Sequence, residues 1–205
     1  MNSLTGVLVL AGGKSERMNF PKAYLLFKEE TFLKRIVEEY YDAGIKKIFV
    51  VLNEDLCIEK WKTFNDQIKS KATLINNPDP DLGRFHSLKL GLKKMQNLEF
   101  CFIQNIDNPL VSKEIINSLI AARNSIGYAS PQFMGRNGHP VLISKKVVRH
   151  LNGLPEGNFN LKNILSDFSR NVVQVNTNDI LININTEEEY ERCIEKRKLM
   201  NVKTT

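Results

Sequence analysis

The sequence contains few cysteines and no long apolar segment. Its three cysteines, Cys57, Cys101 and Cys193, are widely spaced, and none forms a CxxC pair. We therefore expect free thiols in a reducing cytoplasm rather than a disulfide or zinc framework. No apolar run approaches the roughly 20 residues that span a bilayer. No Lys or Arg precedes the short apolar run 7–10, so we expect neither a membrane span nor a secretory signal.

The composition is that of a globular protein with a modest excess of positive charge. Of the 205 residues, 42% are hydrophobic and 25% are charged, which predicts one folded domain over residues 1–205. The formal net charge of +6 is compatible with anionic partners. No basic run is interleaved with aromatic residues, and no zinc-finger or RNP-like signature is present, so nucleic acid is not an expected partner.

Short β-branched runs alternate with segments of helical period. The predicted strands are 6–10, 47–52, 72–75, 100–104, 127–130, 140–143, 172–175 and 180–184. The predicted helices are 31–43, 55–68, 84–96, 112–124, 161–168 and a last one from about residue 187. Near-continuous apolar strands that alternate with amphipathic helices predict a three-layer α/β fold with a mostly parallel sheet covered on both faces. The stretch 152–160, rich in Gly, Pro and Asn, is expected to be a loop.

Ligands of such sheets bind at the carboxyl ends of the strands. The loops of interest therefore follow Leu10, Ile75, Gln104 and Ile184. The first of them contains Gly12 and Gly13, which let the backbone approach phosphate oxygens, and basic residues follow at 14, 17 and 22. A P-loop is excluded because Leu8 stands where its first glycine is required. A basic turn between a strand and a helix is the simpler alternative.

The stretch Leu-Ala-Gly-Gly-x-Ser-x-Arg-Met-x-x-Pro-Lys, residues 10–22, resembles the signature loop of the MobA-like NTP transferase family. The resemblance implies a Rossmann-like fold of the nucleotide-diphospho-sugar-transferase type. It also implies that the loop wraps a nucleoside triphosphate, with Arg17 and Lys22 neutralising its phosphates as catalytic residues. The residues implied to line the nucleotide here are Leu10, Ala11, Gly12, Gly13 and Ser15.

Later segments extend the resemblance along the chain. By resemblance, a segment that contains Asn77, Gly83 and Ser87 helps to hold base and ribose. Asp107, in Asp-Asn-Pro after an apolar strand, would bind Mg²⁺, and Asn185 would supply a second metal contact. A lone carboxylate and one amide oxygen suit Mg²⁺, which completes its octahedron with substrate phosphates and water.

Several of these residues also have structural interpretations. Asp107 and Asn185 are typical helix N-cap or turn residues, and Ser87 suits the first turn of a helix. His139, in a Gly-His-Pro segment that resembles the cytidylyltransferase branch, is assigned to the acceptor side, with a structural histidine as the alternative. Ile106 replaces a glycine that family members often have, and the family's acceptor segment is not evident at residues 156–161.

The resemblance implies a Mg²⁺-dependent enzyme that moves an NMP from an NTP to a phosphorylated small-molecule acceptor and releases pyrophosphate. We expect GTP to be preferred over CTP, because Gly12 leaves more room beside the base than the alanine that is typical of the cytidylyl branch. Two alternatives remain: a sugar- or polyol-phosphate nucleotidylyltransferase, and a non-catalytic nucleotide-binding module. The sequence does not define the oligomeric state.

Overall fold

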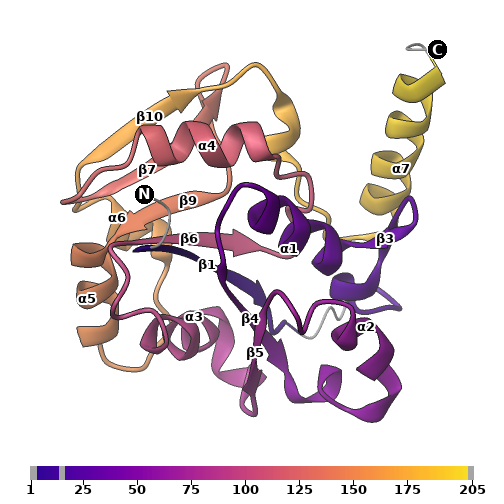
Figure 1. Cartoon of the computed structure of the whole chain (residues 1–205), viewed down its shortest axis with the longest axis horizontal. Coiled ribbons are helices and arrows are strands. Elements are labelled where there is room, and N and C mark those ends of the chain that lie inside the picture. The colour runs from indigo at the N-terminus through magenta and orange to yellow at the C-terminus, as the bar shows by residue number, and fades with distance from the viewer. Residues whose placement is uncertain (1–3, 14–16, 203–205) are drawn as a thin grey trace.

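A single sheet of eight strands organises the molecule (Figure 1). The computed structural model describes residues 4–13 and 17–202. The strands run in the order β10-β7-β9-β6-β1-β4-β5, and β8 pairs with β7. Their bounds are β1 Thr5–Ala11, β4 Lys47–Asn53, β5 Thr73–Asn77, β6 Phe100–Asn105, β7 Tyr128–Phe133, β8 Arg136–Asn137, β9 Val141–Ser144 and β10 Arg170–Gln174. Four adjacent strands (β6, β1, β4 and β5) are parallel, whereas β9 is antiparallel to both β6 and β7.

The central position of β1 follows from its sequence. All seven of its residues are buried, because parallel strands pair with it on both edges and helices cover both faces. In register, Leu10 pairs with Val51 of β4 and with Asn105 of β6. The carboxyl ends of these three strands therefore meet at one edge of the sheet.

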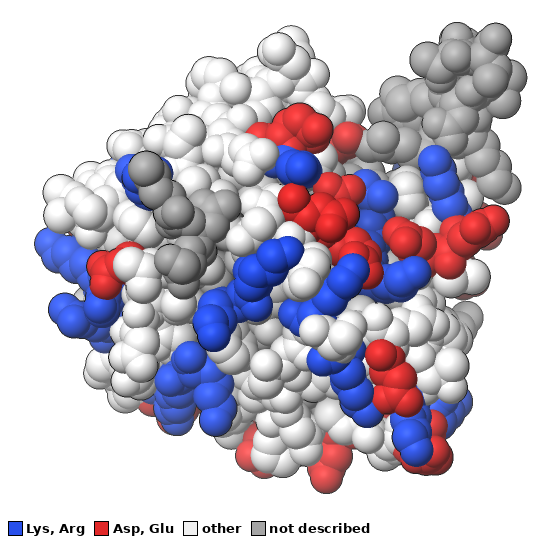
Figure 2. Space-filling view, viewed as in Figure 1, with Lys and Arg blue, Asp and Glu red and all other residues white. Residues whose placement is uncertain are grey.

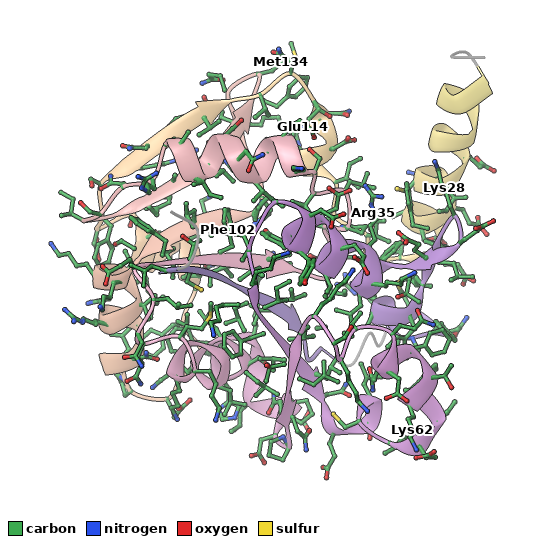
Figure 3. The ribbon with its side chains drawn as sticks, viewed as in Figure 1. Lys28, Arg35, Lys62, Phe102, Glu114 and Met134 are labelled. Carbon is green, nitrogen blue, oxygen red and sulfur yellow. The ribbon has the colours of Figure 1, made fainter. Side chains whose placement is uncertain are left out.

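Helices cover the two faces of the sheet and make the expected three layers (Figure 1). Helices α1 (Phe32–Asp42) and α4 (Lys113–Ala121) pack on one face, where Phe102 of β6 lies in the core between sheet and helices (Figure 3). Helices α3 (Gly83–Lys93), α5 (Lys145–Gly153) and α6 (Leu161–Leu165) pack on the other face. The prediction of a three-layer, mostly parallel α/β fold is confirmed.

Helix α1 shows how local sequence sets the ends of an element. Thr31 caps its first turn by accepting a hydrogen bond from the Lys34 amide at 3.1 Å. Gly44 follows the helix with φ = +85°, the left-handed conformation that ends helices and that glycine adopts without strain. The predicted apolar stripe of this helix, which includes Ile36 and Tyr40, is fully buried.

Some helices and one hairpin of the structure differ from the prediction. The helix expected over 55–68 is broken into two 3-10 turns, Glu54–Leu56 and Glu59–Trp61, and the short α2, Lys62–Asp66. The Asn53 side chain accepts the amide hydrogen of Leu56, which favours a separate turn there. Helix α5 was not predicted, and neither was the small hairpin of β2 (Leu26–Phe27) and β3 (Glu30–Thr31).

The strand predicted over 180–184 is wrong. Residues Asn178–Leu181 form a 3-10 turn, and an extended segment then runs past the end of β6. Its backbone bonds to loops instead of to a strand: the His139 amide donates to Ile180 O at 2.9 Å, and the Ile184 amide donates to Asp107 O at 2.8 Å. The last helix, α7, Glu187–Val202, begins directly after this segment.

The surface in Figure 2 carries acidic and basic side chains side by side. The excess of six positive charges is therefore not gathered into one patch on this face. Among the described residues, the structure contains no helix with the length and apolar character needed to cross a membrane.

Candidate active site

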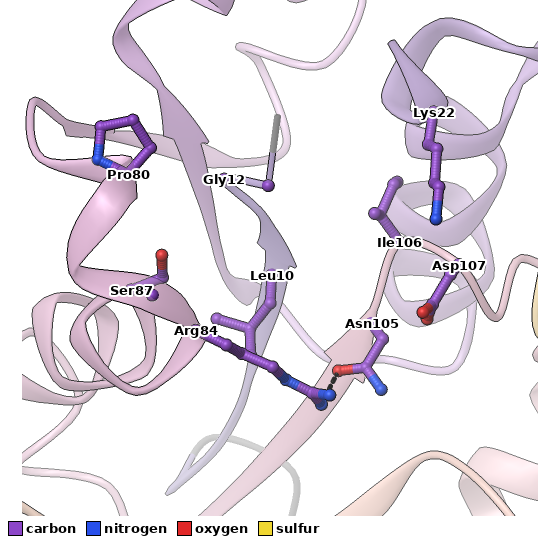
Figure 4. A pocket seen from close by; sticks show the side chains of 11 residues that line it. Leu10, Gly12, Lys22, Pro80, Arg84, Ser87, Asn105, Ile106 and Asp107 are labelled. Carbon is purple, nitrogen blue, oxygen red and sulfur yellow. Dashed lines mark hydrogen bonds between the residues drawn. The ribbon is translucent and has the colours of Figure 1, made fainter. Parts of the chain in front are cut away.

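A cavity of about 280 Å³ opens where β1 and β6 end and α3 begins (Figure 4). It brings together seven residues that the sequence singles out: Leu10, Gly12, Gly13, Lys22, Gly83, Ser87 and Asp107. Four further lining residues were not predicted: Pro80, Arg84, Asn105 and Ile106. Of the other predicted residues, those that the structure describes do not line the cavity: Ala11, Arg17, Asn77, His139 and Asn185. Ser15 falls outside the described part of the chain.

The turn after β1 forms one wall of the cavity. Ala11 still belongs to the strand and its side chain packs in the core, so it reaches the site through its backbone. Gly12 is buried, and a Cβ there would lie 3.1 Å from Ser87 Oγ. Asn53, at the end of β4, donates from Nδ2 to Gly13 O at 3.4 Å. The wall between β1 and α3 thus has little room for a side chain at position 12.

Asn77 orients Ser87 and does not line the cavity. Its Nδ2 donates to Ser87 Oγ at 2.9 Å, and its Oδ1 accepts the Asp79 amide at 3.0 Å. Asn77 is fully buried at the end of β5. Gly83 begins α3 with φ = +85°, a left-handed conformation that glycine adopts without strain, and it lines the cavity. The predicted base and ribose segment therefore forms one hydrogen-bonded wall.

Lys22 lies in a short 3-10 turn, Lys22–Tyr24, and reaches into the cavity. Its Nζ donates to Asn185 Oδ1 at 2.8 Å, which joins the first loop to the segment before α7. Burial lowers the pKa of Lys22, the negative charge of Asp107 opposes that shift, and the positive charge of Arg17 adds to it. Arg17 is exposed and does not line the cavity, but its charge acts on Lys22. The two predicted cations are therefore neighbours.

Asp107 lies just beyond the end of β6, between Lys22 and Asn105 in the close view (Figure 4). Its Oδ1 is buried and has no hydrogen-bond partner. A buried carboxylate oxygen without a hydrogen-bond partner lowers the stability of the fold. Such an atom is therefore expected at a site where a bound ligand supplies the missing partner. No group of three or more His, Cys, Asp or Glu that could hold a metal occurs among the described residues. A divalent cation would fit here with few protein oxygens and mostly substrate ligands.

His139 lies two residues before β9, outside the cavity lining. Burial lowers its pKa, the positive charge of Arg84 lowers it further, and Asp107 opposes the shift. Its neighbour Gly138 is required sterically, because a Cβ there would lie 2.5 Å from Ile180 O. His139 is thus close enough for the charges of Arg84 and Asp107 to act on it, although it does not line the cavity.

Sequence reasoning missed a polar network at the end of β6. Asn105 accepts a hydrogen bond from Arg84 Nη2 at 2.5 Å and donates to Asn108 Oδ1 at 3.2 Å. Asn108 in turn donates to Asn183 Oδ1 at 2.6 Å. The sequence does contain a sign of this network: amide side chains at the end of an apolar strand need hydrogen-bond partners, and residues 104–108 include three of them, Gln104, Asn105 and Asn108.

The first loop is anchored by aromatic packing outside the cavity. Phe20 meets Trp61 edge to face at 5.4 Å, and Trp61 stacks on Tyr24 at 4.8 Å. Because these rings flank Lys22 in the chain, the cluster holds the segment that carries it. An aromatic pair of this kind contributes about 0.5–1.5 kcal/mol.

We expect Phe20→Ala to raise the KM for the NTP by roughly 2- to 10-fold, the factor equivalent to that free energy. The melting temperature should change little, because Phe20 is 39% exposed. Steady-state kinetics with Phe20→Leu as the matched variant checks this. An unchanged KM in Phe20→Ala would show that the ring contact does not position the loop.

The fold and this edge of the sheet define a class: an α/β nucleotide-binding enzyme with a glycine loop and, among the described residues that line its cavity, one carboxylate. The model of the MobA-like NTP transferase domain matches residues 7–172, and the chain belongs to this family. It is a nucleotidyltransferase, as the resemblance of residues 10–22 implied.

Known proteins of similar length resemble this chain in sequence or in fold. The probable molybdenum cofactor guanylyltransferase of Clostridium perfringens is 27% identical over 203 residues, which cover 93% of this chain and 96% of that protein. A nucleotidyl transferase from Methanothermobacter thermautotroptrophicus has a similar fold, with a TM-score of 0.77, 18% identity and coverage of 95% and 97%. A Mycobacterium tuberculosis protein solved in complex with manganese has a TM-score of 0.71, 16% identity and coverage of 95% and 100%.

Proposed function

We propose that this enzyme transfers GMP from GTP to the phosphate group of an acceptor, the molybdenum cofactor, and releases pyrophosphate. The observation that carries the proposal is the juxtaposition of Lys22 and the unpartnered Oδ1 of Asp107 at the mouth of the glycine turn. The guanylyl donor and the cofactor acceptor come from the name of the relative in Clostridium perfringens.

The reaction needs positioning and charge neutralisation, without a covalent enzyme intermediate. A phosphate oxygen of the acceptor attacks the α-phosphorus of GTP, and the bond from that phosphorus to the α,β-bridging oxygen breaks. Pyrophosphate leaves with the electron pair of that bond. Lys22 and Arg17 would offset the charge that accumulates on the β- and γ-phosphates. Gly12, Gly13 and Ser87 would hold the nucleoside on the opposite wall.

We assign a Mg²⁺ site to Asp107, with Asn185 as a second oxygen ligand. Bound Mg²⁺ would supply Lewis-acid polarisation of the α-phosphate. The unpartnered Asp107 Oδ1 supports this assignment. Asn185 Oδ1 already accepts a hydrogen bond from Lys22 and has a second lone pair for a cation. His139, placed near Arg84 and Asp107 by its electrostatic environment, would face the acceptor.

Pyrophosphate release tests the proposed reaction. With GTP and Mg²⁺, release should depend on added molybdenum cofactor and should exceed that with sugar phosphates or polyol phosphates by at least about 10-fold, a difference of roughly 1.4 kcal/mol in transition-state binding. A faster reaction with a sugar or polyol phosphate would reassign the acceptor. Nucleotide binding without pyrophosphate from any acceptor would favour a binding module.

The base preference gives a further prediction. Because Gly12 carries no side chain, the backbone of residues 11–13 can approach the edge of the base, and we expect GTP to stabilise the fold more than CTP. A ligand at about 100 times its Kd adds about 2.7 kcal/mol, which raises the melting temperature of a domain of this size by roughly 5–10 °C.

Gly12→Ala is the matched variant for this prediction, because its methyl would lie 3.1 Å from Ser87 Oγ. It should reduce the thermal shift with GTP more than the shift with CTP. A larger shift with CTP than with GTP in the parent enzyme would contradict the purine assignment.

A further inference from the structure

Arg84 places a further positive charge in the cavity. The proposed reaction assigns it no role, because Lys22 and Arg17 are the residues assigned to the triphosphate. It lies in the first turn of α3 and lines the cavity. Its neighbour one turn along, Ser87, is bonded to Asn77 of β5, on the nucleoside wall. The Arg84 side chain runs the other way, past Leu10 to Asn105 of β6 (Figure 4). One helix turn therefore serves two different walls of the cavity.

The guanidinium of Arg84 is fixed, yet most of its donors are free for a ligand. It donates from Nη2 to Asn105 Oδ1 at 2.5 Å, a neutral acceptor. In the described part of the chain it forms no ion pair with a carboxylate. An arginine has five N–H donors in a planar fork that matches phosphate oxygens in bidentate geometry. Arg84 is accessible to solvent, and its one side-chain partner among the described residues is a neutral amide. Since none of their carboxylates neutralises it, the guanidinium can bind an anionic ligand.

The hydrogen bonds of Asn105 explain why Arg84 is held at this point. Asn105 donates its Nδ2 hydrogen to Asn108, so its Oδ1 faces Arg84. Gln104 donates to both Asn105 O at 2.8 Å and Asn108 O at 2.9 Å, and Tyr40 donates to Gln104 Oε1 at 3.0 Å from the core. The chain of amides connects the anchor of Arg84 to buried structure, which limits its freedom before a ligand binds.

The position of Arg84 separates it from Lys22. The two side chains enter the cavity from different sides, with Asp107 and Ile106 on the strand end between them (Figure 4). The charge of Arg84 acts on His139 just before β9, whereas the charge of Arg17 acts on Lys22. The site thus has one cationic pole at the first loop and a second on the β6–β9 side.

We propose that Arg84, held by Asn105, binds the phosphate monoester group of the acceptor and presents it to the α-phosphorus. This rests on the proposed function, in which Lys22 and Arg17 serve the triphosphate. The ligand class is a phosphate monoester dianion. Arg84 would place its phosphorus on the β6 side, so that one of its oxygens faces the nucleotide bound over β1.

Inorganic phosphate is the probe for this subsite. Its binding is measured by ³¹P NMR titration of the enzyme saturated with Mg²⁺ and α,β-methylene-GTP, which cannot transfer its nucleotidyl group. Arg84→Gln should weaken phosphate binding at least about 10-fold. The phosphate affinity of Arg84→Lys should lie between those of the wild-type enzyme and Arg84→Gln, because lysine keeps the positive charge but cannot form the bidentate hydrogen bonds of a guanidinium. The GTP-analogue Kd should stay within about 2-fold in both variants, since each keeps the nucleoside wall and Lys22.

Arg149→Gln, an exposed arginine on α5, is the matched control and should change neither affinity. Melting temperatures verify that each variant is folded. Wild-type phosphate affinity in Arg84→Gln would overturn the proposal, as would wild-type enzyme that binds no phosphate. A GTP-analogue affinity that falls as much as phosphate affinity would assign Arg84 to the triphosphate instead. Failure of the wild-type enzyme to bind the GTP analogue would contradict the proposed function, while phosphate titration without nucleotide would still report on Arg84.

Discussion

Asp107→Asn should reduce turnover at least about 100-fold, which corresponds to roughly 2.7 kcal/mol of lost transition-state stabilisation. The substitution keeps the shape of the side chain but removes the only negative charge that lines the cavity within the described residues. Without that charge, a divalent cation is bound weakly and the α-phosphate is poorly polarised. Steady-state rates of pyrophosphate release over a range of Mg²⁺ concentrations measure the loss.

The fold should survive this substitution. Asp107 Oδ1 has no hydrogen-bond partner to lose, and the backbone bond from the Ile184 amide to Asp107 O is unaffected by the side chain. The melting temperature without ligand should therefore match that of the parent. Asp167→Asn, at an exposed site that does not line the cavity, is the control and should keep full activity. Near-normal turnover of Asp107→Asn in Mg²⁺ would refute the metal assignment.

Lys22→Ala should lower kcat/KM at least about 100-fold, with a higher KM for GTP and a lower kcat. The lower kcat follows because charge accumulates on the leaving pyrophosphate in the transition state. Its hydrogen bond to Asn185 holds the ammonium inside the cavity, and burial already lowers its pKa, so this charge has been taken partly out of water. A charge in such a setting interacts more strongly with phosphate than a solvated one.

Two variants separate the contributions of Lys22. Lys22→Arg keeps the charge and should retain more activity than Lys22→Ala. Asn185→Ala removes this hydrogen bond together with the proposed second metal ligand, and it should raise KM while leaving the charge of Lys22 in place; repeating the assay at saturating Mg²⁺ separates the two effects. If Lys22→Ala alters KM alone, Lys22 anchors the ground state only; if its kinetics equal those of the parent, the residue has no part in the reaction.

The parallel part of the sheet could be predicted because its strands are buried on both faces. Strands such as β1 and β4 are short, near-continuous apolar runs, the pattern typical of central strands in a parallel sheet. The alternation Ile180, Ile182, Ile184 has the same period as a strand, but this segment joins no strand of the sheet, and its backbone bonds to His139 and Asp107 in loops instead. Helix α5 was missed because its apolar stripe is short and contains adjacent valines, Val147 and Val148, which favour strands locally.

Site residues that lie at strand ends or in the motif of the family resemblance could be predicted from the sequence. Site residues that are brought in by tertiary contacts could not. Asp107 and Gly12 follow apolar strands directly, so their place at the ligand edge follows from topology. The contact from Arg84 to Asn105 joins a helix turn to a strand end 21 positions later, and no local pattern encodes it. The single domain proposed over residues 1–205 is compatible with one continuous sheet.

The position of an isotopic label tests the central claim most directly. The enzyme is incubated with molybdenum cofactor, Mg²⁺ and GTP that carries ³²P either at the α-phosphorus or at the γ-phosphorus. The proposed reaction transfers the α-label to the acceptor and releases the γ-label as pyrophosphate, in equal amounts, and Asp107→Asn loses both signals together. Release of the γ-label as orthophosphate, or its transfer to the acceptor, would contradict nucleotidyl transfer at this site.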